Sequence, residues 1–295
     1  MRTLASLAIL AASFAPPILA DDVGATEPAP AAQSFKLGTL TLTSLRDGQF
    51  VAPNDARIFS ADAGVAAVAD VLRTAGLPDD RITVSIDALL VRTGGHVVLI
   101  DTGNGPKAHG VLPASLGIAG VTPAQVTDVL ITHSHGDHVG GLLDVSGKPA
   151  FPNATIRMSA AEWAWVRSKP ESADLVKAIK ARVRTFKPGG MVAPGIRALP
   201  LDGHTPGHVG YEITSGKERL LDIGDLAHSS VISLEKPEWA MGFDSDRALT
   251  KVTRRATLAK LASDREWTFA PHFPYPGVGH VVVDDGAFRW VEGTP

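Results

Sequence analysis

The sequence has no cysteine among its 295 residues and no excess of basic charge. Without cysteine, disulfides and thiolate-bound metals are excluded, so a metal site must be built from histidine and carboxylate side chains. The net charge is −3, from 28 basic and 31 acidic residues, and no stretch is densely basic. Since proteins that bind nucleic acid present a basic face, we expect no nucleic-acid partner.

The apolar run at the N-terminus is too short to cross a bilayer as a helix, which needs about 20 residues. The run covers residues 4–14, follows Arg2, and is succeeded by Ala20 at a suitable cleavage position. This pattern predicts a signal peptide over residues 1–20 and an exported protein, periplasmic or secreted, with no stable membrane insertion after processing. A buried first helix is the alternative.

Residues 21–34 are rich in alanine and proline, which predicts a disordered linker. The composition shows no break from residue 35 to residue 295, so we expect a single domain there, large enough for a sizeable core. Strands and helices are mixed in both halves of this domain, which favours a mixed α/β fold with two sheet layers and helices outside. The predicted strands are 37–45, 82–91, 97–100, 129–132, 196–199, 209–213, 219–223, 267–270, 280–283 and 288–291, and the longer predicted helices are 61–75, 173–183 and 245–262.

Two motifs have the spacing of a capping box, in which Ser or Thr precedes Glu or Gln by three residues at a helix start. The first pairs Thr122 with Gln125, and the second pairs Ser159 with Glu162. The sequence therefore assigns Glu162 a local role at the beginning of a helix.

Three histidines and an aspartate lie within six residues, directly after the apolar strand predicted over 129–132. His133 and His135 alternate, so in extended backbone they point to the same side and suit one metal ion. Asp137 and His138 follow a glycine that permits a tight turn, which places them to face a second ion. A solvated histidine-rich loop is the alternative, and the strand before the motif argues against it.

Further metal-capable side chains lie at the ends of other predicted strands. His204 and His208 belong to the motif Gly-His-Thr-Pro-Gly-His. Asp225 ends the motif Asp-Ile-Gly-Asp, and His272 follows a late strand. A scaffold built on sheets can gather such side chains from distant parts of the chain at its strand ends.

With the turn Asp101-Thr102-Gly103, these motifs resemble those of the metallo-β-lactamase superfamily, in the same order, from about residue 35 to the C-terminus. The resemblance implies a four-layer αβ/βα sandwich of the α/β (α+β) class, with two metal ions at one edge. Asp101 and His208 are expected to support the site rather than bind metal. The ligand set that the resemblance implies is His133, His135 and His204 on the first ion, Asp137, His138 and His272 on the second, and Asp225 bridging both.

The resemblance also implies the chemistry of the site. Imidazole and carboxylate ligands suit two divalent ions, with zinc the first choice and manganese, cobalt or iron the others. A water that bridges two cations becomes a hydroxide nucleophile near neutral pH. Asp137 and Asp225 are the expected catalytic residues, and Asp137 would orient this hydroxide and pass a proton to the leaving group. Ser134 lacks the Gly-x-Ser-x-Gly surroundings of a nucleophilic serine.

Residues 224–228, 243–246 and 271–280 resemble the methyl parathion hydrolase and lactonase-like branch of this superfamily. That branch implies hydrolysis of a small ester, lactone or organophosphate, and it is compatible with a homodimer. A quorum-quenching lactonase and a β-lactamase-like amide hydrolase are the alternatives within the hydrolases. An iron-dependent redox enzyme of the same fold and a binding protein that has lost catalysis are the alternatives from other classes.

His228 and Phe273 are the candidates for substrate contact. His228 follows Asp225 by three residues, where it is placed either to hydrogen-bond a substrate oxygen or to face solvent. Phe273 adjoins the predicted ligand His272. Other aromatic side chains serve either the pocket or the core, and these are Phe50, Phe59, Trp163, Trp165 and Trp239.

We expect the purified protein to contain zinc, manganese or cobalt and to hydrolyse an aryl ester in that form, because its ligands are imidazoles and carboxylates. Elemental analysis by mass spectrometry, combined with the ester assay on the same sample, measures both. Bound iron without any ester hydrolysis would instead support the redox enzyme.

Overall fold

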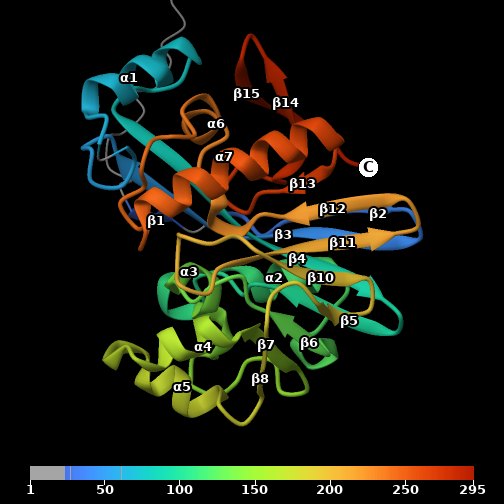
Figure 1. Ribbon diagram of the computed structural model, residues 1–295. Helices are drawn as coiled ribbons and strands as arrows, with labels where there is room; N and C mark the ends of the chain where they lie inside the picture. Colours follow the sequence, from blue (N-terminus) through green and yellow to red (C-terminus); the bar gives the residue numbers. More distant parts are fainter. Residues whose placement is uncertain (1–23, 27, 61) are drawn as a thin grey trace, which may run out of the picture.

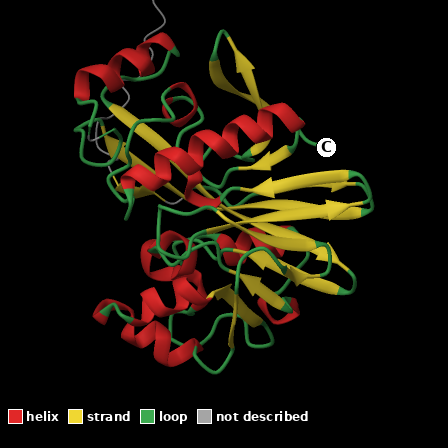
Figure 2. Cartoon of the chain, viewed as in Figure 1, coloured by secondary structure: helices red, strands yellow, loops and turns green. Residues whose placement is uncertain are grey.

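The computed structural model describes residues 24–26, 28–60 and 62–295, and the predicted signal peptide lies outside these residues. Two β-sheets face each other, and helices lie on the outer side of each (Figure 2). No helix in the described part of the chain combines the length and the apolar character needed to cross a membrane.

The first sheet has eight strands, in the order β1-β3-β4-β5-β6-β7-β8, with β2 paired to β3. Pairing is antiparallel from β1 to β5 and parallel from β5 to β8. The strands are β1 (Gly24–Thr26), β2 (Ala32–Leu37), β3 (Leu40–Pro53), β4 (Arg81–Thr93), β5 (His96–Ile100), β6 (Asp128–Leu130), β7 (Thr155–Ser159) and β8 (Val183–Phe186).

The second sheet has seven strands, in the order β15-β14-β13-β12-β11-β10-β9. Every pair is antiparallel except β12 with β13. The strands are β9 (Met191–Ala193), β10 (Ile196–Pro200), β11 (Val209–Ser215), β12 (Glu218–Asp222), β13 (Trp267–Phe269), β14 (Val278–Asp284) and β15 (Ala287–Glu292). The α-helices are α1 (Val65–Thr74), α2 (Leu112–Ile118), α3 (Gly136–Val139), α4 (Ala160–Arg167), α5 (Ala173–Ile179), α6 (Ile232–Glu235) and α7 (Arg247–Asp264).

Both faces of the first sheet are buried. Neighbouring residues of a strand point to opposite faces, so each strand contributes side chains to two cores. Leu89 and Val98 lie in the core between the sheets, together with Tyr211 of β11. Leu90 and Leu99 lie in the core on the other face, which α2, α4 and α5 cover. The helix α7 packs on the outer face of the second sheet in the same way (Figure 1). The predicted four-layer αβ/βα sandwich is therefore confirmed.

The predicted linker over residues 21–34 overlaps the folded domain. The strand β1 pairs with β3, and β2 begins at Ala32, opposite Leu45 of β3. Alanine and proline in this stretch suggested disorder, but β3 supplies hydrogen-bond partners that local composition does not reveal. The prediction is wrong for Gly24–Thr26 and for Ala32 to Ser34.

Helix predictions differ from the structure mainly at their ends. The helix predicted over 173–183 ends at Ile179, and Val183 begins the strand β8, which the sequence reading missed. The capping box at Thr122 is confirmed, although it opens only a single 3₁₀ turn, Pro123–Gln125. At Ser159 the hydroxyl accepts the backbone N–H of Glu162 and α4 begins as predicted.

A buried side-chain hydrogen bond links the two sheets within their shared core. The hydroxyl of Tyr211, which is fully buried, donates to the backbone oxygen of Ile131 at 2.7 Å. Burial and its neighbours Asp101 and Asp222 raise the pKa of Tyr211 well above its usual range, so this hydroxyl keeps its proton.

We expect Tyr211→Phe to lower the free energy of unfolding by about 1–3 kcal/mol, because it leaves the buried Ile131 carbonyl without this donor. Urea unfolding followed by circular dichroism measures the change. Tyr275→Phe is the control, since that hydroxyl lies 3.4 Å from the Ser44 oxygen and makes a weak bond. Equal losses in the two variants would contradict a structural role for the Tyr211 hydroxyl.

Candidate metal centre

The predicted ligands gather at one edge of the sandwich, where strands of both sheets end. His133 and His135 follow β6 of the first sheet. His204 follows β10, Asp225 follows β12, and His272 follows β13, all three in the second sheet. The fold thus brings together side chains that are far apart in the sequence.

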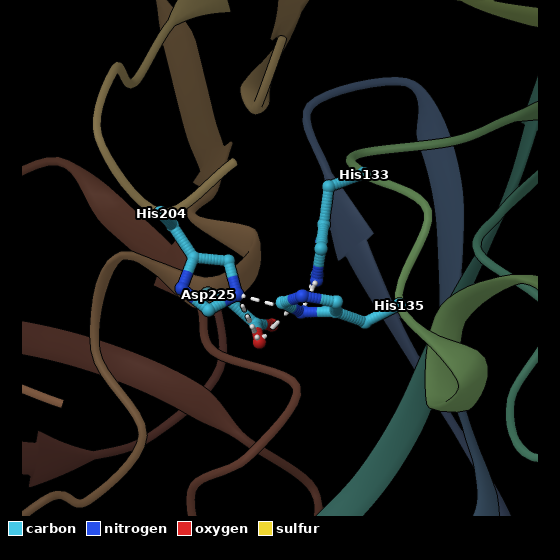
Figure 3. Close-up of side chains that lie close together, drawn as sticks. All are labelled: His133, His135, His204 and Asp225. Carbon is cyan, nitrogen blue, oxygen red and sulfur yellow. Dashed lines mark hydrogen bonds and ion pairs between the residues drawn. The ribbon is translucent and has the colours of Figure 1, made fainter. Parts of the chain in front are cut away.

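One group of facing atoms belongs to His133, His135, His204 and Asp225, and Figure 3 shows these side chains converging. Nδ1 of His135 lies 3.0 Å from Nε2 of His133 and 3.0 Å from Nε2 of His204. The Oδ2 atom of Asp225 lies 3.1 Å from Nε2 of His204. All four ligand atoms lie within 4.8 Å of one another, which is the geometry expected around one ion.

A second group lies on the other side of the same carboxylate. Asp137, His138 and His272 bring one atom each to within 4.8 Å of the others. The Oδ1 atom of Asp225 lies 2.9 Å from Nε2 of His138 and 3.0 Å from Nε2 of His272. The two oxygens of Asp225 therefore face different groups, as the predicted bridging position requires.

The outward-facing nitrogens of three histidines are occupied by acceptors. Nδ1 of His204 donates to Asp244 at 3.0 Å, and Nδ1 of His138 donates to Asp101 at 2.8 Å. Nδ1 of His272 donates to the Ser85 backbone oxygen at 2.8 Å. These bonds fix the rings so that their Nε2 atoms face Asp225.

This donor set fits a cation. When Nδ1 of each ring carries the proton, Nε2 is a hydrogen-bond acceptor. These acceptors face the Asp225 carboxylate, which is also an acceptor only. Nε2 of His138 is buried and has no hydrogen-bond partner within the described residues. Such an arrangement of buried acceptors is stable when positive charge lies between them.

The electrostatics of the site agree with this interpretation. Burial acts against the charged form of His204, but Asp225 and Asp244 raise its pKa to about 9. Burial also acts against ionised Asp225, but His138, His133 and His272 hold its pKa well below the usual range. The carboxylate is therefore ionised at neutral pH, and its surroundings favour positive charge.

Residues 81–272, which include all of these side chains, match the family model of the metallo-β-lactamase superfamily. The chain belongs to the metallo-β-lactamase superfamily. With its buried histidine and aspartate groups, this membership makes the chain a metallo-hydrolase with a divalent metal centre.

Two solved structures of the superfamily are similar over nearly their whole length. AidC, a dizinc quorum-quenching lactonase, is 30% identical with a TM-score of 0.83, over 90% of this chain and 98% of AidC. The hydrolase AbOPH is 29% identical with a TM-score of 0.79, over 90% of this chain and 98% of AbOPH. The fold of this superfamily member is thereby established, whereas the methyl parathion hydrolase branch stays a prediction.

Curated relatives match over shorter segments. An N-acyl homoserine lactonase of Bacillus cereus is 25% identical over 199 residues, which are 60% of this chain and 77% of that protein. A probable metallo-hydrolase of Mycobacterium tuberculosis is 24% identical over 183 residues, and the chain spans 57% of its length. By name, the first is a lactonase and the second a probable metallo-hydrolase.

Asp101 and His208 lie where support for the metal centre was expected. Asp101 accepts from His138 and, through both of its oxygens, from the backbone N–H and hydroxyl of Thr132. His208 donates through Nδ1 to Leu201 and accepts the backbone N–H of Asp225 through Nε2 at 3.1 Å. Burial lowers the pKa of His208 to about 3, so it is neutral and positions the backbone of Asp225.

The two candidates for substrate contact have different outcomes. His228 is buried, its Nε2 lies 2.9 Å from Asp225, and its ring stacks on His272, so the solvent-facing alternative is wrong. The prediction that Phe273 lines the pocket is wrong. Its N–H donates to the Ala270 oxygen in a turn, and its ring packs in the core against Trp290.

Two charged residues to which the sequence analysis gave no role lie behind His204. Asp244 accepts from His204, and the buried Arg254 pairs with Asp244 at 3.5 Å and donates to the Leu226 oxygen at 2.6 Å. Arg254 stands among the buried residues of α7, at helical spacing from Leu258, and a charge in that stripe was the available signal.

A cavity of about 660 Å³ opens onto both groups of facing atoms. Phe50 and Phe59 line it as the sequence allowed, whereas Trp239 lines a different cavity and Trp163 packs on the core. Trp165 lies outside the lining, with its ring 5.7 Å from that of His135. The apolar part of the lining consists of Phe50, Ile58, Phe59, Val84, Ile86, Ala108, Met241 and Phe243.

We expect Asp244→Asn to weaken metal binding about 10–100-fold, because the neutral amide polarises His204 less than the carboxylate does. Competition with a chromophoric chelator measures the affinity, and urea unfolding reports any loss of stability separately. Asp246→Asn is the matched control, since Asp246 caps α7 through Leu249 and Asn caps equally well. Unchanged metal affinity in Asp244→Asn would show that the His204–Asp244 bond is dispensable.

Proposed function

We propose that this superfamily member is a binuclear hydrolase of lactones that carry an apolar acyl chain. The observation that carries the proposal is the cavity, in which an apolar wall lies directly beside the two groups of facing histidine and aspartate atoms. Its volume of about 660 Å³ lies in the range of small-molecule pockets, roughly 300–1,000 Å³. The similarity to the lactonase AidC supports the same substrate class.

The roles proposed for the ligands follow the two groups of facing atoms. His133, His135 and His204 would hold one divalent ion, preferably zinc. Asp137, His138 and His272 would hold the other, and the two oxygens of Asp225 would serve both. The chemistry that such a metal pair supplies when bound is the activation of water at neutral pH and the polarisation of the carbonyl oxygen.

Asp137 is the proposed acid–base residue. It lines the cavity and its side chain is 31% exposed, whereas the Asp225 side chain is 4% exposed. Burial raises the pKa of Asp137, but His138 and His272 lower it below the usual range, so the carboxylate is ionised at neutral pH. From the cavity wall it is placed to orient the attacking water and to return a proton to the alkoxide that leaves when the lactone opens.

His228 is the proposed contact for a substrate oxygen. It lines the cavity beside Asp225 and His272, and its Nε2 lies 2.9 Å from Asp225. Lys107 is the charged side chain of the lining that lies outside the metal groups and their neighbours. An otherwise apolar wall favours a neutral substrate over an anionic one.

Two further expectations stay predictions. Export through a signal peptide over residues 1–20 is tested by N-terminal sequencing of the mature protein. A homodimer is tested by sedimentation of the purified chain.

The substrate class is tested with a series of γ-lactones that carry acyl chains of increasing length. We expect kcat/KM to rise up to about fourfold per methylene until the cavity is filled, since each buried methylene stabilises by about 0.8 kcal/mol. Ile86→Ser should flatten this dependence and leave the unsubstituted lactone unaffected, because Ile86 lies in the apolar wall. Asp225→Asn should lower turnover of every substrate by orders of magnitude.

The same panel contains methyl parathion, an aryl ester and a cephalosporin. Faster hydrolysis of methyl parathion than of any lactone would contradict the proposal in favour of a phosphotriesterase. Rates that do not depend on chain length would remove the acyl chain from the substrate definition.

A further inference from the structure

Glu162 is a buried carboxylate that none of the roles above uses. It lies in the first turn of α4 and is fully buried. Its backbone N–H makes the expected capping bond with Ser159, but its side chain does not return to Ser159. The carboxylate instead extends toward two loops that carry metal-facing histidines.

Each oxygen of Glu162 accepts two hydrogen bonds from one of these loops. Oε1 accepts the backbone N–H of Ser134 at 2.7 Å and its hydroxyl at 2.6 Å. Oε2 accepts the hydroxyl of Thr205 at 2.7 Å and the backbone N–H of Gly207 at 3.1 Å. All four donors are uncharged, so the contact consists of hydrogen bonds. Such bonds form only within a limited range of distances and angles.

The two loops come from opposite sheets. Ser134 stands between His133 and His135, after β6 of the first sheet. Thr205 directly follows His204, after β10 of the second sheet. One carboxylate therefore spans the junction between the sheets, next to the three histidines of the first group.

The packing around this contact leaves little room for the second loop to move. A Cβ atom on Gly207 would lie 2.2 Å from the backbone nitrogen of Glu162 and 2.4 Å from the Ser159 hydroxyl. That hydroxyl also donates to the Gly207 backbone oxygen at 2.7 Å. The beginning of α4 thus holds the loop of His204 at a fixed distance.

We infer that Glu162 is a positioning residue that sets the spacing between His133 and His135 on one sheet and His204 on the other. This inference rests on the proposed metal-binding role of those histidines. Metal ligands that must converge within a few tenths of an ångström require their loops to be held, and such supporting bonds govern metal affinity. Glu162 contacts no ligand atom, so it acts only through the loops.

Glu162→Gln tests the inference, because an amide replaces one acceptor oxygen with a donor. The NH₂ group would face the backbone N–H of Ser134 or of Gly207, and that loop would be released. We expect the affinity for the ion of His133, His135 and His204 to fall about 10–100-fold, while the ion of the second group stays tightly bound. Equilibrium dialysis with zinc and the absorption spectrum of the cobalt-loaded protein measure the two sites separately.

Thr205→Ala is the milder variant, which removes one of the four bonds and keeps the backbone donors. We expect a loss of a few fold in the same site and none in the other. Glu171→Gln is the matched control, since Glu171 is an exposed glutamate just after α4 and should change neither affinity. Excess zinc should restore kcat in Glu162→Gln with KM unchanged.

The outcomes separate this inference from the proposed function. If His204→Ala loses one ion and Glu162→Gln and Thr205→Ala keep both at wild-type affinity, the ligand assignment stands and the positioning role is overturned. If His204→Ala also keeps both ions, the ligand assignment itself fails. A Glu162→Gln protein that is less stable to urea but binds both ions normally would show that the contact serves folding alone.

Discussion

The carboxylate of Asp225 faces two groups of histidines at once, one through each oxygen, and the rest of the structure is arranged around that contact. Its oxygens lie 2.9 to 3.1 Å from the Nε2 atoms of His138, His272 and His204. A buried carboxylate in such surroundings is stable only with positive charge beside it. The two sheets, the loops at their ends and the outward partners of the histidines all serve to keep this arrangement in place.

The supporting contacts share one physical logic. A hydrogen bond at the second nitrogen fixes the orientation and tautomer of a histidine ring, and here Asp101, Asp244 and the Ser85 carbonyl accept it. Backbone segments also need anchors, and His208 bonds the N–H of Asp225 while Glu162 bonds the loops beside it. The site thereby gains a fixed geometry on loops that regular secondary structure does not restrain.

Substrate selection is separated from this machinery. The apolar wall of the cavity comes from β3, β4 and the segments around residues 58 and 241, whereas the metal-facing atoms come from other strand ends. The wall and the metal-facing residues thus lie on different segments of the chain. In this chain the wall is built from phenylalanine, methionine and aliphatic side chains.

The amino-acid sequence was enough to predict the fold class, the superfamily and the residues that the structure brings together at the centre. Those features are encoded locally, in alternating apolar strands and in short histidine motifs directly after them. The contacts of Glu162, Asp244 and Arg254 became visible only in the folded chain, as did the burial of Phe273 in the core and the pairing of residues near Ala32 with a sheet. These depend on partners distant in the chain, and no local pattern reports a hydrogen bond between loops of opposite sheets.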